Sequence, residues 1–275
     1  MCSNPQMSLY VVHHIAVDIP KQPMVIPLRS DCAEGENIAS KFDYCELRAQ
    51  YYVWKSDKTS DYMGFFHYRR YLDISVPAIP ATEKRMHPYR IQKQPAPQSN
   101  NKLLLDAVRQ FDVIAPIPEY TGISVLERYG QGKGQRESDL RMMAELIEER
   151  HPEFSPAAAQ YLNGKSEYYG NMYLMRRAEF QAYCAWLFDL LFEFDRRVPN
   201  APPHTDGYLG ERLFGIYFTW LCSRANARCG VLPRVHFSCY DDSQHHLKKE
   251  NLVSLFLAPG SKLRSTVRVI CKKKK

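Results

Sequence analysis

The sequence predicts a single α/β domain, a sheet flanked by helices. Short apolar runs of strand length, at residues 8–17, 62–66, 112–117 and 168–175, alternate with longer segments whose apolar residues recur at helical spacing. The chain of 275 residues is 45% hydrophobic and 12% aromatic, which is ample for a buried core. We expect one domain over residues 1–260, followed by a basic tail over residues 261–275.

Composition excludes several classes of protein. No apolar run reaches the roughly 18 residues that a membrane span needs, and residues 1–20 lack the pattern of a secretory signal, so a cytoplasmic location is expected. The eight cysteines show no CxxC pair or zinc-ligand spacing and are expected to be reduced thiols. Seven of the 37 basic residues follow Ser261, which leaves 30 basic against 30 acidic residues in the body. A neutral body argues against nucleic acid as a partner.

The first expected strand, residues 8–17, is apolar and β-branched and carries His13 and His14 near its end. Either one of these histidines faces a ligand or both are partly exposed strand-end residues. A helix is expected next, with Asp43 as its N-cap and Glu46 completing a capping box. Its apolar face would carry Leu47 and two aromatic residues further along.

The central strand, residues 62–66, is followed by His67, Arg69 and Arg70. Open α/β sheets bind ligands at the edge formed by the carboxyl ends of their strands. The planar fork of arginine suits phosphate. The group therefore suggests a clamp for a phosphorylated ligand, although an ordinary salt-bridged strand end has the same composition.

The middle of the chain offers fewer signals. Residues 76–101 are rich in proline and are expected to form a long irregular excursion. A helix is expected near residues 103–109 and another at 139–150. The glycine-rich stretch at 129–137 lacks the spacing of a P-loop, which excludes nucleoside-triphosphate hydrolysis and leaves a flexible active-site loop or a solvated one.

Polar residues in the last third stand out against apolar surroundings. Asn171 lies inside the expected strand 168–175, where its amide either closes a sheet defect or faces a polar ligand. After a long amphipathic helix, a second helix is expected from about Gly207. Asp206 and Glu211 lie in its first turns, where a cap and a first-turn charge are the plain structural roles.

Four blocks together resemble a known family. They are GENIASKFDYCELRAQYYVWK, DYMGFFHYRRYL, GNMYLMRRAEFQAYCAWLFDLLFEFD and GYLGERLFGIYF, in that order, within about residues 8–225. The family comprises bacterial polysaccharide-biosynthesis proteins from capsule and O-antigen loci, once catalogued as a domain of unknown function. Some of its members are galactofuranosyltransferases.

The resemblance implies a GT-A-like glycosyltransferase, with a Rossmann-type mixed sheet that binds a UDP-sugar donor and a glycan or lipid-linked glycan acceptor above it. The expected reaction is inverting transfer of galactofuranose from UDP-galactofuranose in capsule or lipopolysaccharide synthesis. In GT-A enzymes an Asp-x-Asp usually holds a divalent metal against the diphosphate, whereas this strand ends in His67-Tyr68-Arg69. No metal and no other cofactor is therefore expected.

Residue roles follow from the same resemblance. Glu211 is the first choice of general base and Asp206 the second. The remaining roles are diphosphate binding by His67, Arg69, Arg70 and His14, lining of the donor pocket by Asn37 and Glu46, and contacts to the sugar by Asn171 and Tyr68. The chain departs from the family at Ile15, where a lysine commonly follows the histidine, and it lacks a histidine expected beyond Tyr129.

Other interpretations stay open. The scaffold could use another nucleotide-sugar donor or retain configuration, or the protein could be a non-catalytic accessory of the polysaccharide machinery. The tail, with its seven basic residues, is expected to hold the protein reversibly against an anionic membrane surface, unless it is simply a solvated terminus.

Overall fold

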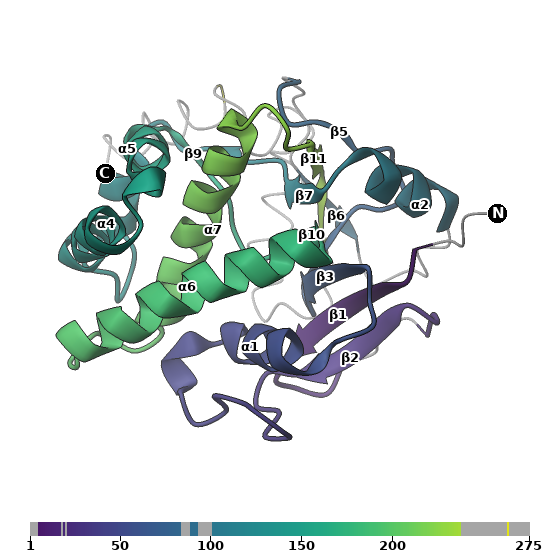
Figure 1. Ribbon diagram of the computed structural model, residues 1–275, viewed down its shortest axis with the longest axis horizontal. Helices are drawn as coiled ribbons and strands as arrows, with labels where there is room; N and C mark the ends of the chain where they lie inside the picture. Colours follow the sequence, from purple (N-terminus) through teal and green to yellow (C-terminus); the bar gives the residue numbers. More distant parts are fainter. Residues whose placement is uncertain are drawn as a thin grey trace.

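The computed structural model describes residues 5–17, 19, 21–83, 89–92, 101–237 and 263. Within them a ten-stranded mixed sheet forms the centre of the molecule, and helices cover both of its faces (Figure 1). The main path of the sheet runs β5-β11-β7-β10-β3-β4-β12-β6, and β1 and β2 branch from β3. This confirms the predicted mixed α/β class.

The strands on which the site depends surround β3 (Tyr62–His67). β3 runs parallel to β1 (Met7–His13) and antiparallel to β10 (Tyr173–Arg176), and it continues through a tight hairpin into β4 (Arg70–Leu72). β12 (Arg234–Phe237) pairs antiparallel with β4. The other strands of this sheet are β2 (Val25–Arg29), β5 (Ile79–Pro80), β6 (Tyr89–Gln92), β7 (Val113–Pro116) and β11 (Cys229–Leu232).

Alternation along the strands divides the apolar residues between two cores. On β3, Met63 and Phe65 pack with the large helical layer, whereas Tyr62 and Phe66 pack on the opposite face. The period of two places successive side chains on opposite faces of a sheet. Because both faces are covered, the strand is apolar throughout rather than alternating in polarity.

The larger layer is built on two long helices, α6 (Arg177–Arg197) and α7 (Thr205–Ser223). Figure 1 shows them crossing over one face of the sheet, with α1 (Leu47–Ser56) beside α6 and with α4 and α5 beyond α7. The bounds of the others are α3 (Val125–Gly130), α4 (Glu137–Arg150) and α5 (Ser155–Asn163). Helix α2 (Asn101–Gln110) lies on the other face, where the Tyr62 hydroxyl donates to the Val108 carbonyl at 2.6 Å.

Short elements complete the described chain. The 3-10 turns η1 (Phe42–Tyr44) and η2 (Pro152–Phe154) precede α1 and α5, and β8 (Glu119–Tyr120) pairs with β9 (Ser166–Glu167) in a separate two-stranded sheet. Among the residues that the structure describes, no helix is both long enough and apolar enough to cross a membrane.

Several expected boundaries are wrong. Asp43 does not cap α1, which begins at Leu47; its Oδ1 instead accepts the backbone N–H of His204, just before α7, at 2.8 Å. The first strand ends at His13 rather than at residue 17.

Two irregular stretches are more ordered than expected, and one strand is shorter. The stretch 129–137 contains the end of α3 and the start of α4, and the excursion 76–101 contributes β5 and β6 to the sheet. The strand expected at 168–175 is formed only from Tyr173, because Gly170 (φ +92°) and Asn171 (φ +45°) take left-handed backbone conformations that no strand accommodates.

Candidate active site

The centre of the candidate site is the hairpin between β3 and β4. His67 and Arg70 pair across it, and Tyr68 and Arg69 form the turn. The backbone N–H of Arg69 donates to His67 Nδ1 at 3.2 Å. Nδ1 therefore carries no proton, and the neutral ring presents its N–H at Nε2.

His67 is not the cation that the sequence suggested. Burial, with the charges of Arg70 and Arg69, lowers its pKa well below the usual histidine value. The neutral side chain offers a hydrogen-bond donor, and the positive charge of the hairpin comes from the two guanidiniums.

Two further histidines and an aromatic ring border the hairpin. His14, one residue after β1, packs edge-on against the Tyr68 ring with centroids 5.2 Å apart, and burial with the Arg69 charge lowers its pKa. The Arg69 guanidinium lies 5.3 Å from the Tyr68 ring centre. On β12, His236 Nδ1 lies 3.5 Å from Arg70 Nε. His236 could not be placed at the site from the sequence, because only the pairing of β12 with β4 brings it here.

Two carboxylates border the loop before β10. The side-chain amide of Asn171 donates to Glu46 Oε1 at 2.9 Å and to the Gly207 carbonyl at 3.2 Å. The backbone N–H of Gly170 donates to Glu211 Oε1 at 2.6 Å. The left-handed loop thus joins Glu46 before α1 to Glu211 on α7. The amide nitrogen of Asn171 thus orients the Glu46 carboxylate, while its Oδ1 meets no partner among the described residues, so contact with a polar ligand stays a prediction.

Arg70 links the two parts of the site. Burial and the nearby charge of Glu211 raise the pKa of Glu46 to about 7, while the Asn171 hydrogen bond and the Arg70 charge oppose the rise. The same Arg70 lowers the pKa of His67. Six of the residues expected from the sequence therefore converge on one edge of the sheet, and His14 lies beside them. The six are Glu46, His67, Arg69, Arg70, Asn171 and Glu211.

A buried ionic network that sequence analysis missed lies behind Glu211. Arg212 is 4% exposed, and its Nη1 lies 2.5 Å from Glu211 Oε2. Its Nη2 lies 3.9 Å from Glu167, which also accepts the Tyr169 hydroxyl. The Arg212 guanidinium lies 5.3 Å from the ring centre of the buried Tyr129. The one signal in the sequence was the charged pair Glu211 and Arg212 inside a largely apolar helix.

Two expected site residues serve the fold. The Asn37 amide donates to the Gly35 carbonyl at 2.9 Å, and its oxygen accepts the Ala39 N–H at 3.0 Å, so this side chain shapes its own loop. Asp206 is buried in the first turn of α7, where burial and the neighbouring Asp195 raise its pKa. Asp195 in turn accepts from Lys41 and Tyr44, which are remote in sequence from the hairpin.

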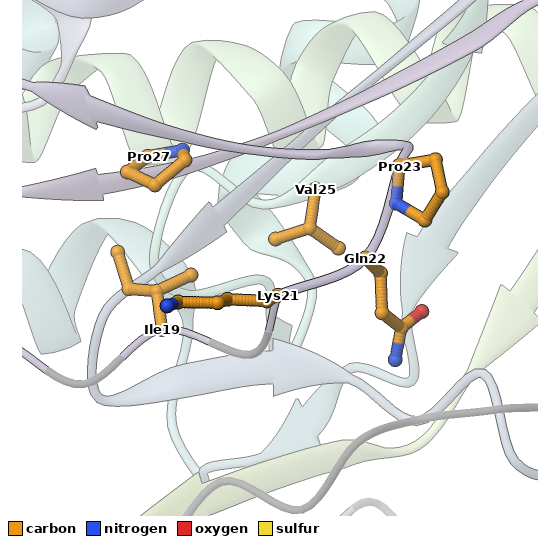
Figure 2. A pocket seen from close by; sticks show the side chains of 6 residues that line it. All are labelled: Ile19, Lys21, Gln22, Pro23, Val25 and Pro27. Carbon is orange, nitrogen blue, oxygen red and sulfur yellow. The ribbon is translucent and has the colours of Figure 1, made fainter.

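A hollow beside β2 provides a contrast to the hairpin. Figure 2 shows its lining, which consists of Ile19, Lys21, Gln22, Pro23, Val25 and Pro27. Lys21 is the one charged member of this lining, so the hollow offers far less to a diphosphate than the hairpin does.

The fold agrees with that of a known glycosyltransferase. The structure described as WbbM, a bifunctional glycosyltransferase in its apo form, matches 85% of this chain with a TM-score of 0.75 and 24% sequence identity. The match takes in 45% of the WbbM chain, so this protein spans less than half of its length. At this identity the similarity concerns the fold alone.

The chain belongs to the family described as "Domain of unknown function (DUF4422)", whose model matches residues 4–221. This confirms the family resemblance noted in the sequence. No curated protein matches the chain.

Proposed function

We propose that the protein is a glycosyltransferase that moves galactofuranose from UDP-galactofuranose, with inversion, to a glycan or lipid-linked glycan in capsule or O-antigen synthesis. The observation that carries this proposal is the convergence at the β3–β4 hairpin. Two guanidiniums, the neutral side chain of His67 and two further histidines lie there beside a pair of carboxylates. The family membership and the shared fold support the same class of reaction.

The cationic part of the site fits the leaving group. When the bond between the anomeric carbon and the phosphate oxygen breaks, negative charge grows on the UDP, and fixed cations stabilise that charge. Arg69 and Arg70 supply two planar forks, and the Nε2–H of His67 supplies a third donor. We propose that these side chains neutralise the diphosphate without a metal ion. His14 and Tyr68 would border the same group.

The carboxylate part of the site fits the acceptor. Inversion requires a base on the acceptor side of the sugar to remove a proton from the attacking hydroxyl. Glu46 is near Arg70 of the hairpin and near Glu211, and Asn171 is placed to orient a donor or acceptor hydroxyl as well.

Release of UDP is the experiment that tests this function. The purified protein would be incubated with UDP-galactofuranose and an oligosaccharide of galactose as acceptor, and UDP would be followed in a coupled assay. Acceptor-dependent release supports the proposal, and the anomeric configuration of the product, read by NMR, tests inversion. A protein that releases no UDP from any nucleotide sugar would be an accessory factor rather than an enzyme.

A further inference from the structure

We propose that Glu46, and not Glu211, is the general base of the reaction, and that Glu211 is a positioning residue. This inference rests on the glycosyl transfer proposed above and deepens it by separating the two neighbouring carboxylates. The sequence favoured Glu211 for the role because it lies on a helix after the NMYLM strand, but the contacts of the two side chains point the other way.

Both oxygens of Glu211 are already engaged. Oε1 accepts the Gly170 N–H at 2.6 Å, and Oε2 lies 2.5 Å from Arg212 Nη1. Arg212 is buried, so a proton placed on Glu211 would leave a guanidinium with a weakened partner inside the protein. These contacts leave neither oxygen free for an acceptor hydroxyl and favour a role in fixing the 170–171 loop.

Glu46 has the opposite arrangement. Oε1 accepts the Asn171 amide at 2.9 Å, whereas Oε2 makes no hydrogen bond to another residue among those that the structure describes. Glu46 as a residue is intermediate between buried and exposed, while its carboxyl is enclosed by protein, which is what raises its pKa; in the proposed complex the acceptor hydroxyl enters this enclosed site to reach Oε2. One oriented oxygen and one available oxygen are what proton transfer from a bound hydroxyl needs.

The backbone around Glu46 is held in an unusual conformation. Cys45 has φ +49° and His204 has φ +67°, and the Cys45 thiol lies 3.3 Å from His204 Nδ1. Together with Asn171 these are the non-glycine residues with positive φ in the described chain, and all three adjoin Glu46 or the start of α7. Backbone strain of this kind concentrates at functional sites.

The charges that face Glu46 suit a base. The charge of Glu211 on α7 raises the pKa of Glu46, and the charge of Arg70 on β4 lowers it. Cys45 and Arg48 are the titratable and charged neighbours on the same segment as Glu46. The resulting pKa of about 7 matches neutral pH, where a base is available yet still basic enough to take a proton. Arg70 also faces the hairpin, so base and leaving-group site share a cation.

The step balances without any further reactant. The acceptor oxygen forms a bond to the anomeric carbon of the donor as the bond from that carbon to the phosphate oxygen breaks. UDP leaves with the electron pair of the broken bond. The hydroxyl proton passes to Glu46 Oε2 and is released to solvent before the next turnover.

The test compares Glu46→Gln with Glu211→Gln from pH 5.5 to 8.5. Glutamine keeps the size of Glu46 and can still accept from Asn171, so UDP should bind with nearly unchanged affinity in calorimetry. We expect Glu46→Gln to lose roughly 10²–10⁴-fold in kcat, together with the acidic limb of the pH profile near pH 7. Glu211→Gln should keep that limb. Glu127→Gln, on the exposed surface of α3, is the matched control and should behave as wild type.

Each outcome decides a different point. Two results would overturn the assignment of the base and leave glycosyl transfer standing. One is an active wild type together with a kcat of Glu46→Gln within about threefold of the wild-type value. The other is loss of the acidic limb in Glu211→Gln alone. A wild-type protein inactive on every nucleotide sugar overturns the proposed function, and with it the base. As a readout besides activity, the ¹³C carboxyl resonances of glutamate should include one that titrates near pH 7 and vanishes in Glu46→Gln; its absence in wild type contradicts the assignment.

Discussion

Arg69, like Arg212, has a buried Nε that meets no hydrogen-bond acceptor among the described residues. Its guanidinium lies 5.3 Å from the Tyr68 ring centre, at the tip of the hairpin. An unsatisfied buried donor costs about 1–3 kcal/mol, so its retention at this position points to an anionic ligand as the missing partner.

The first prediction concerns this side chain. Arg69→Ala should raise the donor KM and lower kcat, because the diphosphate is charged in the ground state and gains charge in the transition state. A charged hydrogen bond contributes about 1.5–3 kcal/mol, so kcat/KM should fall roughly 10- to 150-fold in steady-state assays. Arg141→Ala, on the exposed side of α4, serves as the control; equal kinetics of the two variants would remove Arg69 from the site.

The second prediction concerns Asp206 as a structural carboxyl. The pKa of Asp206 is raised in the folded protein, so folding favours the protonated carboxyl. The protonated side chain therefore contributes its full stabilisation below the ordinary carboxyl pKa of about 4, and this stabilisation is lost as the pH rises. Asp206→Asn should therefore raise the melting temperature relative to wild type at pH 8.5 and change it little at pH 4. Calorimetry at the two pH values gives the comparison, and an equal shift at both would contradict the raised pKa.

For single residues, the sequence identified the residue types at the site better than their protonation states and contacts. His67, Arg69 and Arg70 were found because three polar groups ended an apolar strand. The neutrality of His67 could not be predicted, because it depends on burial and on a backbone N–H from the turn. Arg212 was missed because its partners, Glu167 and Glu211, meet only in the folded chain.

Among the elements, helices with a long apolar period were predicted well, and α6 lies where the spacing of its buried residues placed it. The loop at 168–172 was taken for strand because its aromatic residues satisfy the same pattern. Tertiary contacts decide against it: Asn171 bonds to Glu46, 125 residues away, and Gly170 bonds to Glu211. Local sequence carries no signal for such pairings.

The third prediction concerns the contact of α5 with α7 that supports this loop. A Cβ at Gly215 would overlap Cζ of the Tyr161 ring, and the Tyr161 hydroxyl accepts the Tyr168 N–H at 3.3 Å. Gly215→Ala should force the helices apart and destabilise the protein by about 1–3 kcal/mol, measured by denaturant unfolding. Ser223→Ala, at the exposed end of α7, should stay within about 0.5 kcal/mol. If the two variants are equally stable, the close approach of the helices is not as described.

For the whole molecule, composition and strand spacing sufficed for the α/β class but not for the sheet order. β10 lies between β3 and β7, and β12 lies between β4 and β6, so the pairings join segments far apart in the chain. Several orders are compatible with the same set of strands, and the tertiary contacts that select one are not encoded locally. The site depends on this order, since β12 brings His236 to the hairpin.

The fourth prediction concerns the basic segment 262–275, which apart from Leu263 lies outside the described residues. Clustered basic residues gain about 1 kcal/mol each near an anionic membrane, and salt weakens the attraction. Deleting the segment should abolish salt-sensitive binding to vesicles that contain phosphatidylglycerol, while transfer to a soluble acceptor stays intact. Vesicle co-sedimentation measures this, and unchanged binding after deletion would place the attachment elsewhere.

The central claim is that the hairpin handles the diphosphate of a nucleotide sugar without a metal ion, and the rate of acceptor-dependent UDP release in EDTA tests it most directly. UDP-galactofuranose and UDP-galactopyranose would be compared as donors for wild type and Arg69→Ala. We predict release from UDP-galactofuranose that persists in EDTA, far exceeds release from UDP-galactopyranose and falls in the variant. Release that stops in EDTA and returns only with Mn²⁺ or Mg²⁺, or that is indifferent to Arg69, would contradict the account.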